Sequence, residues 1–485
     1  MNNELLNYLK LSAERDWLEY YSDNWARNQN VDASKCLSKS LFQLTQAKLA
    51  QISAVVAKPE QLKTILIVEQ NPIQFIASFF ASVIAEVNLF LCDPGWKRKE
   101  WQQVLSLVKP DLILGDSPAT DLIGKLESTV PDPPNVITKA ELPDRSLIMI
   151  PTGGTSGKIK FAIHSWQTLA ASVEGFRIFF ACEQINSFCT LPLYHVSGLM
   201  QLMRSFLTQG KLIICPYKSI PTQPIEINKS AYFISLIPTQ LKFLLVNLSD
   251  WLSQFRTILV GGAPASRSLL DTAKEYNLAI APIYGTTETA SGVVALKPQD
   301  FLAGNYSNGK VMPHAQISIK DSRIAATGNR TTIGLIEIKG RSLYLGYYPL
   351  LSPPVSSLLT DDLGYFNHQG YLQIVGRDSQ KIITGGENVF PIELEEVIYS
   401  TKLVQDVCVI GIPDPKWGQA VTAIYVPTAA NNLDLIKQQM RSQLAKYKQP
   451  KNWLKVDYIP RNNRGKVNYQ ELQAIALQLL DKNLS

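Results

Sequence analysis

Residues 147–160 read LIMIPTGGTSGKIK. The run 147–150 is apolar and predicts a buried strand. It leads into residues 152–160, which hold three glycines, two threonines, one serine and two lysines. Glycines let a backbone approach a ligand closely, and N–H groups, hydroxyls and ammonium groups attract an anion. The stretch therefore predicts a polyphosphate-binding loop, and the alternative is a flexible surface turn.

This loop is not a Walker A motif. Thr152 stands where that motif has its first glycine. Ile159 follows Lys158, where the motif needs the Ser or Thr that binds Mg²⁺.

Strand and helix patterns alternate before the loop. This alternation predicts a parallel sheet covered by helices. Residues 1–60 have a mainly helical pattern, and the Pro-rich stretch 116–144 predicts a surface connection. The predicted strands are 64–68, 87–92, 112–114 and 147–150, and the predicted helices are 72–85 and 98–108.

The same alternation continues after the loop, with polar segments where strands end. Ligands bind at such ends in open α/β sheets. A further strand is expected to end at Pro192, before a helix that starts near Gly198. The other predicted strands are 211–215, 232–237, 257–260 and 279–284, and the helices are 165–179, 239–248 and 266–275.

The pattern changes twice towards the C-terminus. Residues 309–376 predict a small β-rich subdomain, and the rest predicts a compact α+β unit. We expect an α/β fold with a domain of residues 1–377 and a smaller one of residues 378–485. The β-rich part has strands at 316–320, 334–339 and 371–375; the last unit has helices at 391–400 and 432–447, strands at 406–411 and 421–426, and a tail from 450.

The composition limits the classes of ligand and the cellular location that we expect for this chain. The 485 residues are 46% hydrophobic and 18% charged, with a net charge of +6 spread along the chain. This fits an anionic small molecule better than nucleic acid. The six cysteines lie singly and no Cys/His group has zinc spacing, so a reducing cytoplasmic location is expected.

No membrane or secretory segment is predicted. Residues 75–92 are the most apolar stretch, but Glu86 and Asn88 interrupt it, so a buried helix and strand are expected. The N-terminus is of mixed charge, unlike a signal peptide.

Six motifs in order resemble those of the adenylate-forming superfamily, which includes acyl- and aryl-CoA synthetases. The resemblance covers nearly the whole chain. The chain departs from the family pattern at Gly153, Ile159 and Asp361, where the family has Ser, Pro and Gly. The motifs are the loop 152–160, YGTTE at 284–288, TDDLG at 360–364, GRD at 376–378 with Lys381, GGEN at 385–388, and PRNNRGK at 460–466.

Two segments are similar to one subfamily, the 2-succinylbenzoate–CoA ligases of menaquinone and phylloquinone biosynthesis. These segments are LPLYHVSGL at 191–199 and GGAP at 261–264. The chain is also short for the superfamily.

The resemblance implies two reaction steps. A carboxylic acid attacks the α-phosphate of MgATP, and the thiol of coenzyme A then replaces AMP. It also implies a C-terminal lid that rotates between the steps. The expected ligands are therefore ATP, Mg²⁺, coenzyme A and a small carboxylic acid.

The resemblance assigns residues to the nucleotide and the metal. Glu288 would bind Mg²⁺, and the alternative for it is a surface helix cap. Tyr284 would lie near adenine, and the alternative is core packing. The residues assigned to the nucleotide are Thr152, Gly153, Gly154, Thr155, Ser156, Gly157 and Lys160 for the phosphates, Gly261, Gly262, Ala263, Pro264 and Tyr284 for adenosine, Gly285 and Thr286 for the nucleotide as a whole, Thr287 for the α-phosphate, Asp362 for the ribose, and Arg377 for the ribose or phosphate.

The resemblance also assigns catalysis and domain movement. Lys466 is the expected catalyst of the first step, and the alternative is a solvated lysine. His195 would line the acyl pocket, and the alternative is a core imidazole. Further assignments are Ser197, Arg204, Ser291 and Gly292 for the substrate, with Arg204 for a second carboxylate, Asp378 for the hinge, and Gly385, Gly386 and Glu387 for the coenzyme A channel.

Three other functions remain open at this point. The chain could act on another aryl or acyl acid, or it could load acyl-AMP onto a carrier protein. It could also be a nucleotide sensor on an inactive scaffold. Retention of both Glu288 and Lys466 disfavours the sensor.

Overall fold

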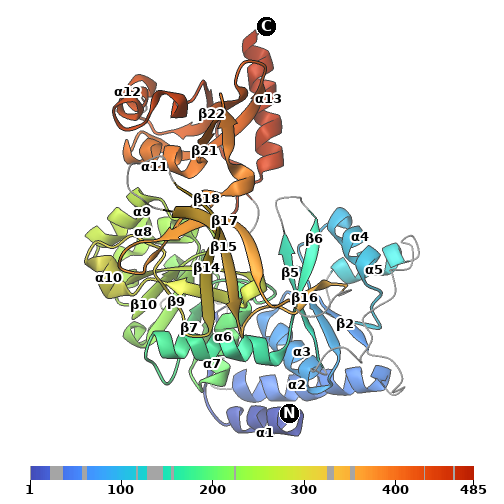
Figure 1. The fold of residues 1–485 in the computed structure, drawn as a ribbon. Coiled ribbons are helices and arrows are strands. Elements are labelled where there is room, and N and C mark those ends of the chain that lie inside the picture. The colour runs from blue at the N-terminus through green and yellow to red at the C-terminus, as the bar shows by residue number, and fades with distance from the viewer. Residues whose placement is uncertain are drawn as a thin grey trace.

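Figure 1 shows the chain as a large N-terminal part below a smaller C-terminal unit. The computed structural model describes residues 2–21, 37–56, 63–115, 118–127, 146–153, 158–222, 225–324, 332–349, 355–430, 432–461 and 465–484. The α/β class predicted from the sequence is confirmed. No helix in these ranges is long and apolar enough to cross a membrane.

The first sheet carries the predicted phosphate loop. Its strand order is β16-β6-β5-β3-β2-β4, and the strands β4, β2, β3 and β5 are parallel. Every residue of β2 and β3 is buried, as expected for a sheet covered on both faces. The strands are β2 (Thr64–Ile67), β3 (Asn88–Leu91), β4 (Leu112–Leu114), β5 (Ile148–Gly153), β6 (Ile159–His164) and β16 (Gly346–Tyr348).

The helix α3 (Pro72–Ile84) shows why this half folds locally. Asn71 caps it by accepting hydrogen bonds from the N–H groups of Ile73 and Gln74, and Pro72 occupies its first turn. Most of its residues are buried in the core. The other helices of this half are α1 (Asn2–Ser12), α2 (Leu37–Val56), α4 (Arg98–Leu107) and α5 (Pro118–Glu127).

A second sheet of eight strands has the order β1-β8-β7-β9-β10-β11-β12-β13. The strands from β1 to β11 are parallel, and β12 and β13 are antiparallel. The strands are β1 (Leu18–Tyr20), β7 (Asn186–Cys189), β8 (Leu212–Ile214), β9 (Tyr232–Leu236), β10 (Thr257–Val260), β11 (Ile280–Thr286), β12 (Ser291–Ala295) and β13 (Lys310–Val311). Its helices are α6 (Trp166–Phe179), α7 (Val196–Leu207), α8 (Pro238–Ser253), α9 (Arg267–Glu275) and α10 (Pro298–Leu302).

A four-stranded antiparallel sheet lies between these halves and the C-terminal unit in Figure 1. Its order is β14-β15-β17-β18. Pairing of β17 with β18 sets Asp362 opposite Arg377. The strands are β14 (Ala315–Ile324), β15 (Thr332–Gly340), β17 (Leu358–Phe366) and β18 (Leu372–Arg377).

The C-terminal unit has its own sheet and its own apolar clusters. Its order is β20-β19-β22-β21, and β23 pairs with β22. The elements are β19 (Ile382–Thr384), β20 (Glu387–Val389), β21 (Val404–Asp414), β22 (Gly418–Pro427), β23 (Asn452–Lys455), α11 (Pro391–Ser400), α12 (Leu433–Gln443) and α13 (Tyr469–Leu484).

Several local expectations were wrong. The glycine-rich loop connects β5 to an antiparallel strand, β6, which the sequence reading missed. The stretch expected to be a surface connection contains α5, and the expected tail contains β23 and α13. The strands β1 and β17 were also missed, and β7 ends at Cys189 rather than Pro192. These elements are short or lack strong periodicity, so tertiary packing decides them.

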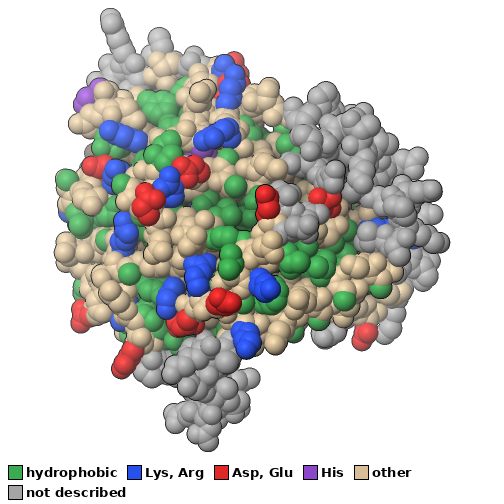
Figure 2. Space-filling model, turned by 90° about the horizontal axis from the view of Figure 1, so that it is seen from below, with side chains coloured by type: hydrophobic (Ala, Val, Ile, Leu, Met, Phe, Trp, Pro, Cys, Tyr) green, Lys and Arg blue, Asp and Glu red, His purple; other side chains and the backbone are tan. Residues whose placement is uncertain are grey.

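Figure 2 shows the face seen from below, where charges of both signs are interspersed with apolar side chains. The described part of this face has no large field of a single sign.

Candidate active site

The predicted phosphate loop links β5 to β6 along the chain, and these two strands pair antiparallel. Thr152 and Gly153 end β5, and Thr152 pairs with Lys160 of β6. Gly154, Thr155, Ser156 and Gly157 lie outside the described residues. The exposed ammonium group of Lys160 lies 5.0 Å from the centre of the Tyr347 ring.

Glu288 is a buried carboxylate without a basic partner. Its residue is 9% exposed, which excludes the surface cap considered above. Its Oε1 accepts a 2.7 Å hydrogen bond from the Tyr347 hydroxyl. Among the residues that the structure describes, no Lys, Arg or His comes within ion-pair distance of it. A buried charge needs compensation, so this carboxylate fits a cation such as Mg²⁺.

His164 holds the segment beside Glu288. Its Nε2 donates to the Thr287 carbonyl over 2.8 Å, and its Nδ1 lies 3.0 Å from the Thr168 hydroxyl. Burial lowers the pKa of His164 to about 4, so the ring is neutral near pH 7. A neutral ring with two fixed partners positions the backbone of Thr287. The sequence reading missed His164.

A hydrogen-bonded trio lies at the predicted ribose site. Asp362 accepts from the Tyr284 hydroxyl at 2.8 Å and from Arg377 Nε at 3.0 Å. Burial and the neighbouring Asp362 raise the pKa of Tyr284 well above its ordinary value, so its hydroxyl remains a donor. The structure thus brings together three residues that were predicted separately. The hydrogen bond also fixes the Tyr284 hydroxyl on the Asp362 carboxylate.

Asp361 and Asp362 have different surroundings. Asp361 accepts from the N–H and the hydroxyl of Ser379, which lies in the predicted hinge segment. Asp362 is 8% exposed and faces Tyr284. Of the two, Asp362 therefore fits the nucleoside.

The hydroxyl of Thr286 supports this location. It is buried and has no hydrogen-bond partner within the described ranges. Buried polar groups are almost always satisfied in native proteins. This hydroxyl is therefore a candidate donor to a bound nucleotide. Gly285 stands beside it in β11.

The predicted adenosine loop lies beside the turn that carries Lys466. Gly261, Gly262, Ala263 and Pro264 connect β10 to α9. A Cβ atom at Gly262 would lie 3.3 Å from Ile237 Cγ2. A Cβ atom at Gly465 would lie 2.9 Å from Cδ1 of the same Ile237.

The C-terminal turn is anchored in this position. Gly465 has a φ of +73°, which other residues rarely adopt, and its carbonyl accepts from Arg461 Nη1 at 3.0 Å. Arg461 also pairs with Asp406 at 2.9 Å. Lys466 is exposed at the end of this turn.

Arg204 is a buried cation without an acidic partner. Its residue is 3% exposed, and burial lowers the pKa of the guanidinium to about 10, so it stays charged at pH 7. Its Nη2 donates to the Ser291 hydroxyl at 3.3 Å, and the group lies 4.1 Å from the centre of the Phe176 ring. Within the described chain, its Nε has no hydrogen-bond acceptor, and no Asp or Glu forms an ion pair with the guanidinium.

His314 extends the surroundings of Arg204. A Cβ atom at residue 175 would lie 1.7 Å from His314 Nδ1, so Gly175 makes room for this imidazole. Burial, with Arg204 and Arg341 nearby, lowers the pKa of His314 to about 4. Arg204 is therefore the cation here that a carboxylate would meet. Gly292 lies next to Ser291, and its backbone approaches His314.

His195 and Ser197 lie at the start of the same helix. His195 is 8% exposed at the N-cap of α7, with its ring 4.7 Å from that of Tyr194. Ser197 is seven residues before Arg204, which puts the two on one side of α7. Two predicted substrate residues, Ser197 and Arg204, therefore lie on the same side of α7.

The chain matches two protein-family models. The family model "AMP-binding enzyme" matches residues 56–348, and "AMP-binding enzyme C-terminal domain" matches residues 393–466. The chain belongs to the AMP-binding enzyme family. The resemblance to adenylate-forming enzymes is confirmed.

Named relatives of this AMP-binding enzyme agree with one another. It is 29% identical to the 2-succinylbenzoate–CoA ligase of Listeria monocytogenes, covering 98% of this chain and 99% of that one. It matches o-succinylbenzoate CoA synthetase from Bacillus subtilis in complex with the acyl-adenylate OSB-AMP. The TM-score is 0.78 and the identity 25%, over 96% of this chain and 98% of that chain. A structure of the same synthetase with ATP and magnesium ion matches at a TM-score of 0.78 and 24% identity, over 96% and 99%.

The AMP-binding enzyme has a second group of polar residues around the predicted coenzyme A channel. Gly385 and Gly386 form the β19–β20 turn, and Glu387 follows. Gly385 N–H donates to the Trp417 carbonyl at 2.8 Å. The ammonium groups of Lys416 and Lys451 lie 5.1 Å and 4.9 Å from the Trp417 ring centre. No motif in the sequence had singled out these three side chains.

The predicted hinge residue of the AMP-binding enzyme, Asp378, is exposed and forms an ion pair. Asp378 follows β18 directly, and its Oδ1 lies 2.7 Å from the Lys381 ammonium group. A 3₁₀ turn, Asp378–Gln380, is the first element beyond the four-stranded sheet.

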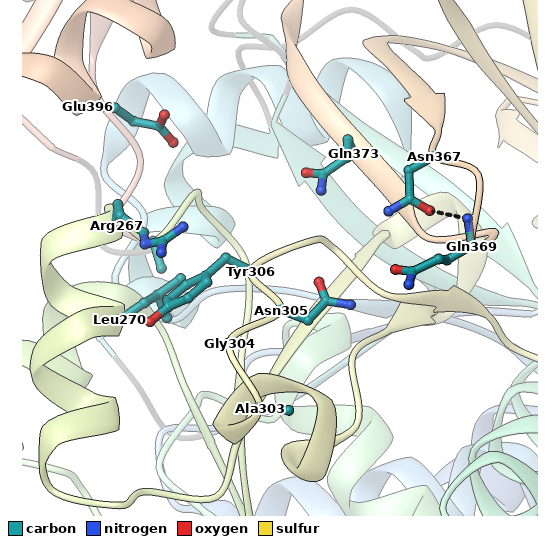
Figure 3. A pocket seen from close by; sticks show the side chains of 11 residues that line it. Arg267, Leu270, Ala303, Gly304, Asn305, Tyr306, Asn367, Gln369, Gln373 and Glu396 are labelled. Carbon is teal, nitrogen blue, oxygen red and sulfur yellow. Dashed lines mark hydrogen bonds between the residues drawn. The ribbon is translucent and has the colours of Figure 1, made fainter. Parts of the chain in front are cut away.

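A separate polar cavity of about 550 Å³ lies between α9 and the C-terminal unit (Figure 3). Arg267 stacks on Tyr306, and Glu396 of α11 points towards them from above. None of the predicted site residues lines this cavity. It is distinct from the candidate active site of this AMP-binding enzyme.

Proposed function

We propose that this chain is an ATP-dependent ligase that converts 2-succinylbenzoate to 2-succinylbenzoyl-CoA in menaquinone or phylloquinone biosynthesis. The named relatives, matched over nearly the whole chain, support this function. The family match supports AMP formation. ATP, Mg²⁺ and coenzyme A are the cofactors and co-substrates that the proposal requires.

In the first step, a carboxylate oxygen attacks the α-phosphorus and pyrophosphate leaves. Both reactants are anions, so the site must supply positive charge and oriented donors. Lys160 and the hairpin backbone at Thr152 and Gly153 would hold the terminal phosphates. Thr286 and Thr287 would donate near the α-phosphate. Lys466, held next to the adenosine loop through Gly465 and Ile237, would stabilise charge on the reacting oxygens.

The nucleoside would lie against the trio of Tyr284, Asp362 and Arg377. Two donors already orient the carboxylate of Asp362, and its remaining lone pairs can accept from ribose hydroxyls. The loop from Gly261 to Pro264 would border the adenosine.

Glu288 would hold Mg²⁺. This carboxylate is buried and lacks a basic partner among the described residues, which suits a hard divalent cation. The bound ion neutralises charge on the phosphate oxygens. The chain's own part is to orient the carboxylate through the hydrogen bond from Tyr347.

One observation supports the dianionic substrate: Arg204 is buried and charged, and within the described chain it has no acidic partner. 2-Succinylbenzoate has one carboxylate to activate and a second to bind. Arg204 with Ser291 would bind the second, while His195, Ser197 and Gly292 would line the rest of the pocket. A monocarboxylic acid would leave the buried guanidinium without compensation.

In the second step, the sulfur of coenzyme A attacks the acyl carbon, the thiol proton is lost and AMP leaves. We propose that residues 378–485 rotate about Asp378 relative to residues 1–377 for this step. Gly385, Gly386 and Glu387 would then line the thiol channel. Trp417 with Lys416 and Lys451 offers an aromatic face and two cations beside that turn, which suits the nucleotide end of coenzyme A.

The proposed location is the cytoplasm, which supplies ATP and coenzyme A. Five cysteines of the described chain are buried free thiols, which suits a reducing compartment.

A panel of acids tests the function. Each acid is assayed for ATP–pyrophosphate exchange, and coenzyme A is then added and the thioester measured by mass spectrometry. We expect strong exchange and thioester formation with 2-succinylbenzoate. Activity confined to fatty acids or to benzoate would contradict the substrate, and exchange without any thioester would indicate a carrier-protein acceptor.

A further inference from the structure

Tyr347 connects two parts of the site that the sequence motifs do not link. It lies on β16, which pairs with β6 so that Tyr347 is opposite Ala162. Its hydroxyl donates to Glu288 Oε1 at 2.7 Å. The N–H group of Tyr344, three residues earlier, donates to the Glu288 carbonyl at 2.8 Å. This segment therefore fixes both the backbone and the side chain of Glu288.

The same tyrosine touches the phosphate hairpin through its ring. The ammonium group of Lys160 lies 5.0 Å from the ring centre, within the range of a cation–π contact. Tyr344 packs edge-on against the ring with centroids 5.0 Å apart. The ring is thus held between Lys160 of β6 and Tyr344.

Tyr347 holds only one of the two carboxylate oxygens of Glu288, Oε1. Glu288 Oε2 accepts no hydrogen bond from the described residues. One carboxylate oxygen is therefore fixed and the other is left for a ligand.

We propose that Tyr347 is a positioning residue for the metal: its hydroxyl holds one oxygen of Glu288 so that the other binds the divalent cation that accompanies ATP. This inference rests on the proposed role of Glu288. Without this hydrogen bond, the carboxylate can rotate about its last side-chain bond. Metal binding must then restrict that rotation, which lowers the affinity for the metal. Oriented partners of metal ligands commonly contribute in this way.

The test uses the full chain and measures binding without turnover. Mn²⁺ replaces Mg²⁺, α,β-methylene-ATP replaces ATP, and free Mn²⁺ is measured by electron paramagnetic resonance. Tyr347→Phe keeps the ring and removes the hydroxyl. We expect Mn²⁺ affinity in the ternary complex to fall about tenfold, with metal-free nucleotide affinity unchanged because the Lys160 contact remains.

Tyr348→Phe is the matched control. Its ring is buried and packs on Phe90 at 4.9 Å, but the described chain shows no hydrogen bond from it to Glu288. Its Mn²⁺ affinity should match that of the unmodified chain. An equal loss in both variants would overturn the proposal, because it would indicate general loosening of β16.

Glu288→Gln separates this inference from the proposed function. If Glu288→Gln leaves Mn²⁺ affinity unchanged, the metal role of Glu288 fails and the inference fails with it. If Glu288→Gln weakens Mn²⁺ binding and Tyr347→Phe does not, the inference alone is overturned. If Tyr347 acts through Glu288, the double variant should bind Mn²⁺ no more weakly than Glu288→Gln alone. Additive losses would instead assign Tyr347 an independent structural role.

Discussion

Arg204 Nη2 lies 3.3 Å from the hydroxyl of Ser291, and this is the hydrogen bond that joins the guanidinium to β12. Arg204 comes from α7, so the contact links a helix of the second sheet to the strand that follows the YGTTE motif. The pair places a positive charge beside the segment proposed to hold the α-phosphate and the metal.

The first prediction concerns this charge. Arg204→Met should raise the KM for 2-succinylbenzoate about 10- to 100-fold, the range expected for a lost charge-assisted hydrogen bond. A benzoate analogue without the second carboxylate should be affected far less. Steady-state pyrophosphate exchange measures both. The matched control is Arg177→Met, because Arg177 pairs with Glu174 and Glu183 at the surface of α6. Equal losses for both acids would contradict the role of Arg204.

The second prediction concerns Lys466. Lys466→Ala should abolish formation of acyl-AMP yet leave thioester formation from supplied acyl-AMP largely intact, because the ammonium group is needed only while the two anions react. The two half-reactions are measured separately, and Lys455→Ala serves as control, since Lys455 is an exposed lysine of the same unit. Full adenylation activity in Lys466→Ala would refute the assignment.

The third prediction concerns rotation of the C-terminal unit. Asp378→Pro should slow thioester formation more than adenylation, because proline restricts the backbone torsion that a hinge must change. Asp378→Ala removes only the ion pair with Lys381 and should slow both steps little, as exposed ion pairs contribute little. A hinge elsewhere would be indicated if Asp378→Pro slowed both steps equally.

The fourth prediction concerns the pH dependence of stability in the C-terminal unit. Burial, with a smaller contribution from the nearby Asp406, raises the pKa of Glu395 to about 7, although the hydrogen bond from Val409 N–H and the nearby Arg461 act to lower it. The folded state therefore binds this proton more tightly than the unfolded state. The resulting stabilisation is fully present below about pH 4.5 and is lost as pH rises through about 7, a change on the order of 3 kcal/mol.

Hydrogen exchange of β21 and β22 between pH 5 and 8, corrected for intrinsic rates, measures this change. Glu395→Gln should flatten the pH dependence of the opening free energy. Asp457→Asn changes an exposed acid of the same unit and should leave the dependence unchanged. An unchanged slope in Glu395→Gln would show that another group titrates.

Much of the candidate nucleotide site could be proposed from the sequence because its residues lie in short local motifs. Glu288, Asp362 and Arg377 carry local signatures, and the register of β17 with β18 then brings the last two together. Tyr347 and Trp417 were missed because nothing in their own sequence surroundings marks them. Tyr347 reaches Glu288 only through pairing of β16 with β6, and Trp417 reaches Gly385 only through the C-terminal sheet.

The hairpin at β5–β6 was missed for a related reason. The segment 159–164 has no strict alternation, and it follows the glycine-rich turn directly. Its strand conformation depends on pairing with β5 on one side and β16 on the other. Such pairing is a tertiary property, so local propensity does not predict it.

Isotope transfer in one turnover tests the central claim, acyl-AMP formation followed by thioester formation, most directly. 2-Succinylbenzoate labelled with ¹⁸O in the reacting carboxylate is incubated with the enzyme, ATP, Mg²⁺ and coenzyme A, and the products are analysed by mass spectrometry. The account predicts one ¹⁸O atom in AMP, together with 2-succinylbenzoyl-CoA. Unlabelled AMP, or label in inorganic phosphate with release of ADP, would contradict it.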